Sequence, residues 1–210
     1  MGALLNRRRY MGGEGKKPLP PGAVRIEYLG VPRTGYFKIP IHASSSCVVE
    51  VDFEYNATSF GQFCIFGGGD GNLTREMSII SGDTVSAYWI YRCNNKQNTR
   101  LLNPGVYQRH IIKWSFLNVT IDGVEYPQRL SASEFIASND VVGLCRNLRT
   151  GYNAFPFEGN IYYAQFKDDN VTISLIPIRI EQEGYLFDEI SGALFGNAGT
   201  DDFILGSDKT

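Results

Sequence analysis

The sequence has few of the residues that build metal and redox centres. Its 210 residues include two His and four Cys. The cysteines, Cys47, Cys64, Cys93 and Cys145, show no C-x-x-C spacing. A structural zinc site needs such side chains in a closely spaced tetrahedral set. We therefore expect no zinc site, no cofactor, and cysteines that are reduced and mostly buried.

Long apolar runs are also absent. No segment approaches the roughly 20 apolar residues that cross a membrane. Near the N-terminus a short apolar stretch precedes the basic residues instead of following them, unlike a secretory signal. The net charge of −2 is too close to zero for a general nucleic-acid binder. We expect no signal peptide, no membrane contact and no direct nucleic-acid partner.

No helical period of any length is present, which excludes α/β folds. The 23 Gly, 13 Phe and 12 Tyr favour strands joined by tight turns. Residues 49–55 alternate apolar with acidic side chains, as a strand with one buried face does. The sequence predicts strands over residues 25–29, 49–55, 62–66, 76–80, 84–91, 109–116, 118–124, 141–144, 159–167, 171–180, 184–188 and 194–195.

Two further segments complete the expected organisation. Residues 131–138 are the best candidate for a short helix, because Ser131 is a suitable N-cap and Glu134 stands at the capping-box position. Residues 92–107 are polar and irregular, which predicts a long surface loop. About a dozen short strands with at most one helix predict an all-β fold of two stacked antiparallel sheets.

Residues 1–22 are predicted to form an arm ahead of one domain at residues 23–210, because their glycines and prolines prevent a regular element. Residues 1–17 carry +5 − 1 = +4, so the remainder carries −2 − 4 = −6. A solvated tail is one interpretation. The other is an anchor onto a partner protein. Its expected contacts are Leu4, Leu5, Arg7, Arg8 and Arg9.

A longer pattern lies toward the C-terminus. Residues 159–166 read GNIYYAQF, residues 175–179 read LIPIR, and residues 184–200 read GYLFDEISGALFGNAGT. This succession resembles the closing strands of LamG-like, concanavalin A-like jelly-roll domains of gut Bacteroides-type bacteria and their phages or prophages. Weaker similarity near residues 26–36 and 119–123 extends the resemblance over most of the chain. It implies a concanavalin-like jelly-roll sandwich.

The resemblance and the basic arm together favour a structural protein of a phage or prophage virion, a surface module of the capsid or tail. Residues 1–22 are then expected to contact other virion proteins. The chain is expected to be made in the bacterial cytoplasm, to enter the particle, and to act as a homo-oligomer or within a larger assembly. Host surface glycans are a further expected ligand.

A bacterial carbohydrate-binding lectin or adhesin is the alternative. Trp89 and Tyr91 flank Ile90 and so share one face of a strand. Aromatic rings on an exposed face can stack on the apolar face of a sugar. The other interpretation of these two residues is a place in the core.

A second alternative is a glycosidase. Glu50, Asp52 and Glu54 alternate along one strand face, similar to the E-x-D-x-E strand of family 16 glycoside hydrolases. No tryptophan-rich stretch precedes this strand, and alternating acids are common on the wet face of a sheet. We therefore expect a protein that is not an enzyme. Asp70, in a glycine-rich turn, is a weak candidate for calcium, which needs more oxygen ligands than we find nearby.

Overall fold

The computed structural model of the chain contains strands and turns, with no helix among the residues it describes. None of the described segments is a helix that could cross a membrane. The described residues are 15–56, 63–69, 77–81, 89–93, 96–101, 108–116, 118–127, 140–149 and 156–209.

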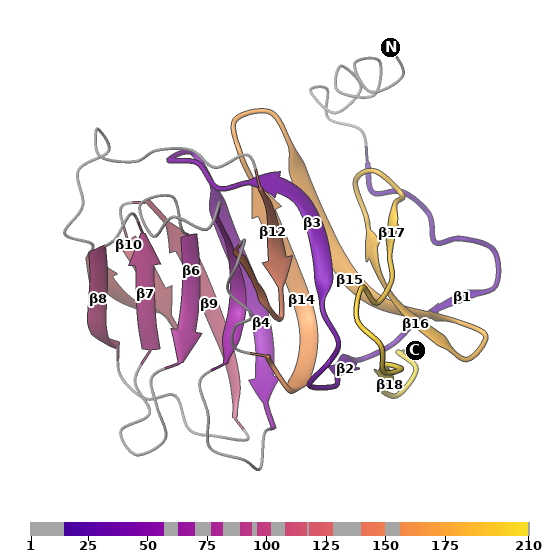
Figure 1. Ribbon diagram of the computed structural model, residues 1–210. Coiled ribbons are helices and arrows are strands. Elements are labelled where there is room, and N and C mark those ends of the chain that lie inside the picture. The colour runs from indigo at the N-terminus through magenta and orange to yellow at the C-terminus, as the bar shows by residue number, and fades with distance from the viewer. Residues whose placement is uncertain are drawn as a thin grey trace.

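Two sheets stack face to face (Figure 1). The larger has eleven strands. Along its main path the order is β11 (Val124–Pro127), β10 (Asn118–Ile121), β9 (Arg109–Ser115), β4 (Val48–Tyr55), β14 (Gly159–Lys167), β15 (Thr172–Ile180), β16 (Glu183–Asp188) and β17 (Leu194–Phe195). Three short strands join off this path: β1 (Ala23–Arg25) pairs with β15, and β2 (Leu29–Val31) pairs with β14 and with β18 (Ile204–Leu205).

The smaller sheet lies in front of the larger one in Figure 1. Its order is β3 (Phe37–His42), β12 (Val141–Leu144), β5 (Cys64–Gly69), β6 (Met77–Ser81), β7 (Trp89–Cys93) and β8 (Lys96–Leu101), with β13 (Asn147–Arg149) beside β5. Among the described strands, only β13 and β5 run parallel; every other ladder is antiparallel.

The core lies between the two sheets because each strand turns alternate residues inward. Phe66 of β5 and Trp114 of β9 meet there edge to face, with ring centroids 6.1 Å apart. Both are fully buried. A smaller apolar cluster forms on the other face of the larger sheet around Ile176, Ile178 and Phe187. The predicted all-β sandwich of two antiparallel sheets is confirmed.

The predicted strands agree well with the structure where the apolar alternation is strong. Residues 141–144, 159–167 and 194–195 have the predicted bounds, and β4 starts one residue before the predicted position. The expected loop over residues 92–107 is wrong, because Lys96–Leu101 forms β8 and pairs with β7. The sequence does not predict β8, because its mostly polar residues show no apolar alternation. The helix predicted at residues 131–138 lies outside the described residues.

Segments near both ends of the described chain are held by hydrogen bonds to distant parts of the domain. The backbone N–H of Lys17 donates to the carbonyl of Glu189 at 2.6 Å, and the Lys16 ammonium lies 2.7 Å from the Glu189 carboxylate. At the other end, the Asn197 side-chain oxygen accepts from the backbone N–H of Tyr36 and from that of Gly199. Asn197 therefore holds the C-terminal segment beside the segment that leads into β3.

Candidate functional site

One face of the larger sheet carries the charged side chains of β4 and β9. The inward residues of β4, namely Val49, Val51 and Phe53, are fully buried. Glu50, Asp52 and Glu54 alternate with them and project from the opposite side, which is turned away from the smaller sheet. We call this side the outer face.

Strand β9 supplies cations to the same face. Its inward residues are His110, Ile112 and Trp114, so Arg109, Ile111 and Lys113 lie on the outer face. The antiparallel register sets Glu50 opposite Lys113 and Glu54 opposite Arg109. Opposite charges on adjacent strands stabilise such pairs. Lys113 accordingly lies 3.1 Å from the Glu50 carboxylate.

Arg109 binds Asp52 on the diagonal, not its direct opposite Glu54. Its Nε donates to Asp52 Oδ1 and its Nη2 to Oδ2, both at 2.7 Å. Such a two-bond pair fixes the plane of the guanidinium. The hydrogen bonds to Asp52, more than any other contact, raise the pKa of Arg109.

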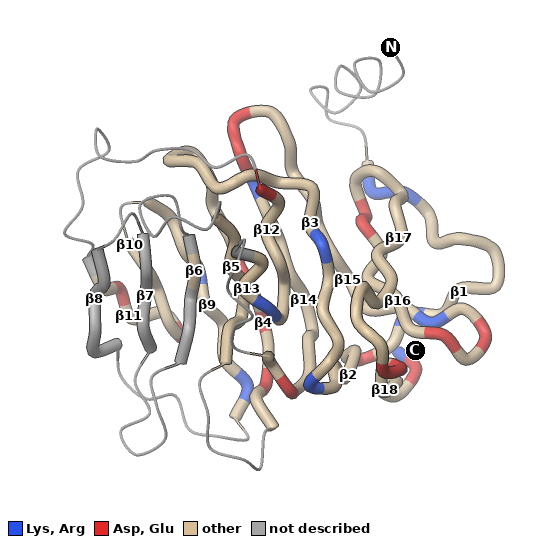
Figure 2. The backbone as a smooth tube through the Cα atoms, viewed as in Figure 1, with Lys and Arg blue, Asp and Glu red and all other residues tan. Residues whose placement is uncertain are grey.

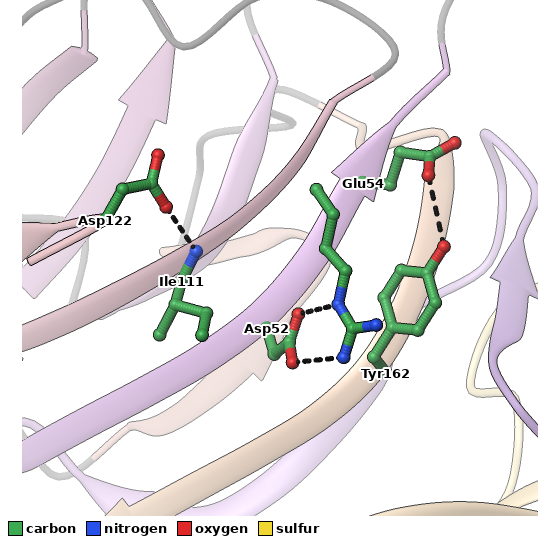
Figure 3. Close-up of polar contacts among 6 residues, drawn as sticks. Asp52, Glu54, Ile111, Asp122 and Tyr162 are labelled. Atoms are coloured by element: carbon green, nitrogen blue, oxygen red, sulfur yellow. Dashed lines mark hydrogen bonds and ion pairs between the residues drawn. The ribbon is translucent and has the colours of Figure 1, made fainter.

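The Tyr162 ring packs against the guanidinium of Arg109. The Arg109 Cζ lies 3.9 Å from the centroid of the Tyr162 ring, a cation–π contact. A β-bulge places this ring, because the pairing of β14 with β4 shifts between Ile161 and Tyr163 and leaves Tyr162 as the extra residue. Figure 3 shows the guanidinium that is bonded to Asp52 lying beside the Tyr162 ring.

The Tyr162 hydroxyl is also fixed. It donates to Glu54 Oε2 at 3.1 Å, as Figure 3 shows. Burial, together with this bond and the nearby Glu54 charge, raises the pKa of Tyr162 to about 12. In the amide orientation that satisfies its neighbours, Asn56 donates to Glu54 Oε1 at 2.7 Å and accepts from Asn160 Nδ2 at 3.1 Å. The carboxylate of Glu54 is thus held at both oxygens.

A second tyrosine completes the group. The Tyr28 ring lies 5.7 Å from that of Tyr162, centroid to centroid, at a tilt of 60°. It comes from the segment between β1 and β2, far from Tyr162 in sequence. We call Tyr28, Asp52, Glu54, Arg109 and Tyr162 the outer-face cluster. Its Arg109 side chain is 50% exposed while that of Asp52 is 12% exposed, so the carboxylate is shielded and the guanidinium faces solvent.

The three acids of β4 share one face, as predicted, but each is engaged by a neighbour. Asp52 is bound by Arg109, Glu54 by Tyr162, and Glu50 by Lys113. A glycosidase needs one carboxyl to protonate the leaving group and another to act as nucleophile or base. Asp52, whose two oxygens both accept short bonds from Arg109, is not free to take either role.

Trp89 and Tyr91 lie in β7 of the smaller sheet, so the structure does not bring them to the outer-face cluster. Trp89 pairs with Ser81 and Leu101, and Tyr91 pairs with Ile79. Only the backbone of these two positions is described. Their predicted role in ligand binding stays a prediction.

The remaining predicted site residues lie outside the described part of the chain. They are Leu4, Leu5, Arg7, Arg8 and Arg9, expected to anchor a partner, and Asp70, the weak calcium candidate. Within the described ranges, no group of three or more His, Cys, Asp or Glu side chains could hold a metal ion. Three of the four cysteines, Cys47, Cys64 and Cys145, are buried thiols outside any disulfide, as expected.

Comparison with solved structures supports the same architecture. A heptameric SAP-like pentraxin from Limulus polyphemus matches with a TM-score of 0.56 and 11% identity, over 88% of this chain and 96% of the pentraxin. The fold is a jelly-roll sandwich. At this identity the likeness shows the fold alone.

A second solved structure is less similar. It is the CBM40 of a Ruminococcus gnavus IT-sialidase, bound to α2,3-sialyllactose, with a TM-score of 0.42 and 14% identity over 71% of this chain and 91% of the module. No protein-family model and no curated protein matches the sequence.

Proposed function

We propose that the chain is a non-catalytic carbohydrate-binding module and that its outer-face cluster contacts the sugar. The observation that carries this proposal is the exposed guanidinium of Arg109, clamped by Asp52 and resting on the Tyr162 ring. Because these groups are fixed before any ligand arrives, binding would cost little side-chain entropy.

The cluster offers the contacts that a sugar uses. Asp52 takes two of the five N–H donors of an arginine, so three remain, and no other described residue accepts them. Carboxylate oxygens of Glu54 and Asp52 can accept from sugar hydroxyls. The neighbouring Tyr28 ring adds an aromatic surface on which the C–H face of a pyranose can pack.

Screening against a glycan array, followed by calorimetric titration of the hits, tests the proposal. Arg109→Ala and Tyr162→Ala should each weaken binding at least tenfold, about 1.4 kcal/mol. Lys167→Ala is the matched control, since Lys167 is an exposed residue at the far end of the same strand β14. The proposal is contradicted if the folded protein binds no glycan on the array, or if both cluster variants bind as tightly as the unmodified chain.

A structural role in a phage or prophage virion is the second candidate, and it rests on the sequence resemblance and the basic arm. The observation that favours it is the attachment of Lys16 and Lys17 to Glu189, which gives the preceding residues a fixed point of departure from the domain. Host glycans and other virion proteins are then both proposed partners, and the particle the proposed location.

Removal of residues 1–14 tests this second candidate, because it spares the contacts to Glu189. The truncated chain should fold with an unchanged melting temperature and fail to enter particles. Normal incorporation of the truncated chain would overturn the anchoring role proposed for Leu4, Leu5 and the arginines.

A further inference from the structure

Negative charge dominates the surroundings of the outer-face cluster. Glu27 precedes Tyr28, whose ring lies 5.7 Å from that of Tyr162, and its charge raises the pKa of Arg109 less than the bonds to Asp52 do. The carboxylates are those of Glu27, Glu50, Asp52 and Glu54, and the cations are Arg109 and Lys113. Four negative charges against two positive ones give these six side chains a net charge of −2, and Figure 2 marks the acidic and basic positions along the backbone.

Neither cation is available as a bare charge. Arg109 is neutralised by Asp52 through two bonds of 2.7 Å, and Lys113 is paired with Glu50 at 3.1 Å. A ligand carboxylate, sulfate or phosphate that used the remaining N–H edge of Arg109 would come beside the Asp52 carboxylate, which already balances the charge of the guanidinium. It would also approach three further carboxylates, whose repulsion acts over several ångströms even in water.

Hydroxyl groups meet no such obstacle. The unused N–H edge of Arg109 can donate to an acceptor, and the carboxylate oxygens of Asp52 and Glu54 can each accept a further bond. A hydroxyl is both donor and acceptor, so neighbouring hydroxyls of one sugar can serve the two kinds of group at once. They also bring no charge into the acidic surroundings.

From this arrangement we infer that the outer-face cluster binds uncharged saccharides and rejects acidic ones. The inference rests on the proposed function and adds the ligand class. In solution, uncharged oligosaccharides should bind at least about tenfold more tightly than acidic oligosaccharides of equal length. Added salt should leave the uncharged ligands unaffected and improve the acidic ones, since salt screens the repulsion.

Calorimetric titrations of the full chain with uncharged gluco-, xylo- and manno-oligosaccharides, and with oligogalacturonate and sialyllactose, test the inference at low and at high salt. A Glu27→Gln/Glu50→Gln variant is the sharper probe. It removes two charges that flank the cluster, so the preference for uncharged ligands should shrink towards equality. Its melting temperature checks that the domain stays folded.

The outcomes separate this inference from the function on which it rests. Equal or tighter binding of the acidic saccharides, lost on Arg109→Ala, overturns the ligand class and leaves carbohydrate binding intact. An unchanged preference in the Glu27→Gln/Glu50→Gln variant overturns the electrostatic explanation. Absence of binding to every saccharide removes the proposed function, and this inference falls with it.

Discussion

Asp52 and Arg109 form an ion pair whose two members differ in their exposure to water: the Asp52 side chain is 12% exposed and that of Arg109 is 50% exposed. The carboxylate depends on the arginine for its hydrogen bonds, whereas the arginine can be hydrated without the carboxylate. Removing Arg109 and removing Asp52 should therefore lower the free energy of unfolding by different amounts.

We expect Arg109→Ala to lower the free energy of unfolding by about 1–3 kcal/mol, because it leaves the Asp52 charge under-solvated. Asp52→Ala should cost less, about 1 kcal/mol or below. Urea unfolding of both variants measures the difference. Lys113→Ala, which breaks an exposed pair on the same face, is the control and should change stability by about 0.5 kcal/mol or less. Equal losses for both cluster variants would contradict the asymmetry.

Tyr162 should make the free energy of unfolding depend on pH under alkaline conditions. Its pKa is raised to about 12 in the folded chain, above the ordinary tyrosine value of 10.0. The unfolded chain therefore loses this proton first as the pH rises, so the stability from Tyr162 is complete below pH 10 and declines between pH 10 and 12. Since the ring is partly exposed, we expect a loss of only about 1 kcal/mol.

Tyr162→Phe removes the titrating group and keeps the ring. Its free energy of unfolding should fall less steeply with pH above 10 than that of the unmodified chain. The matched control is Tyr126→Phe, since Tyr126 lies in β11 at the end of the same sheet, away from the cluster. Parallel curves for the unmodified chain and the Tyr162→Phe variant would show that Tyr162 carries no such coupling.

The C-terminal segment can pack against the backbone of Thr34 only with a glycine at position 199. A Cβ atom there would lie 1.8 Å from the carbonyl oxygen of Thr34, a backbone atom that cannot move aside cheaply. We expect Gly199→Ala to cost about 2–4 kcal/mol. Gly15→Ala is the control, because a Cβ at Gly15 meets nothing within 4 Å. Thermal melting of the two variants checks this, and equal melting temperatures would contradict it.

Buried cysteines should be unreactive in the native state. Burial raises the pKa of Cys47 to about 12, with a further contribution from the charge of Asp168, and burial raises that of Cys145 as well. The reactive thiolate is therefore scarce at neutral pH. Alkylation followed by peptide mass spectrometry should label Cys47, Cys64 and Cys145 only after unfolding. Rapid labelling of any of them in native protein would contradict their burial.

Local patterns predict the fold well here, because a strand with one buried and one solvent-exposed face alternates apolar and polar residues along the sequence. Strand β4 is the clearest case, with acids and apolar residues in strict alternation. Strand β8 shows the limit: its residues, KQNTRL, have no apolar face, and its pairing with β7 could be seen only in three dimensions.

The site was predicted only in part. The acids of β4 stand out in the sequence, yet their partner Arg109 follows 57 residues after Asp52, and no local pattern gives that register. A signal for Tyr162 did exist. The inward residues Ile161 and Ala164 are three apart, which breaks the period of two and marks a bulge between them.

The most direct test of the account is to map where a sugar binds. Heteronuclear NMR spectra of the isotope-labelled chain, titrated with the tightest uncharged oligosaccharide, report on each backbone amide. If the outer-face cluster binds the sugar, the largest shifts should occur at Tyr28, Asp52, Arg109 and Tyr162. Shifts concentrated at Trp89 and Tyr91 in β7, with the outer face unchanged, would contradict it.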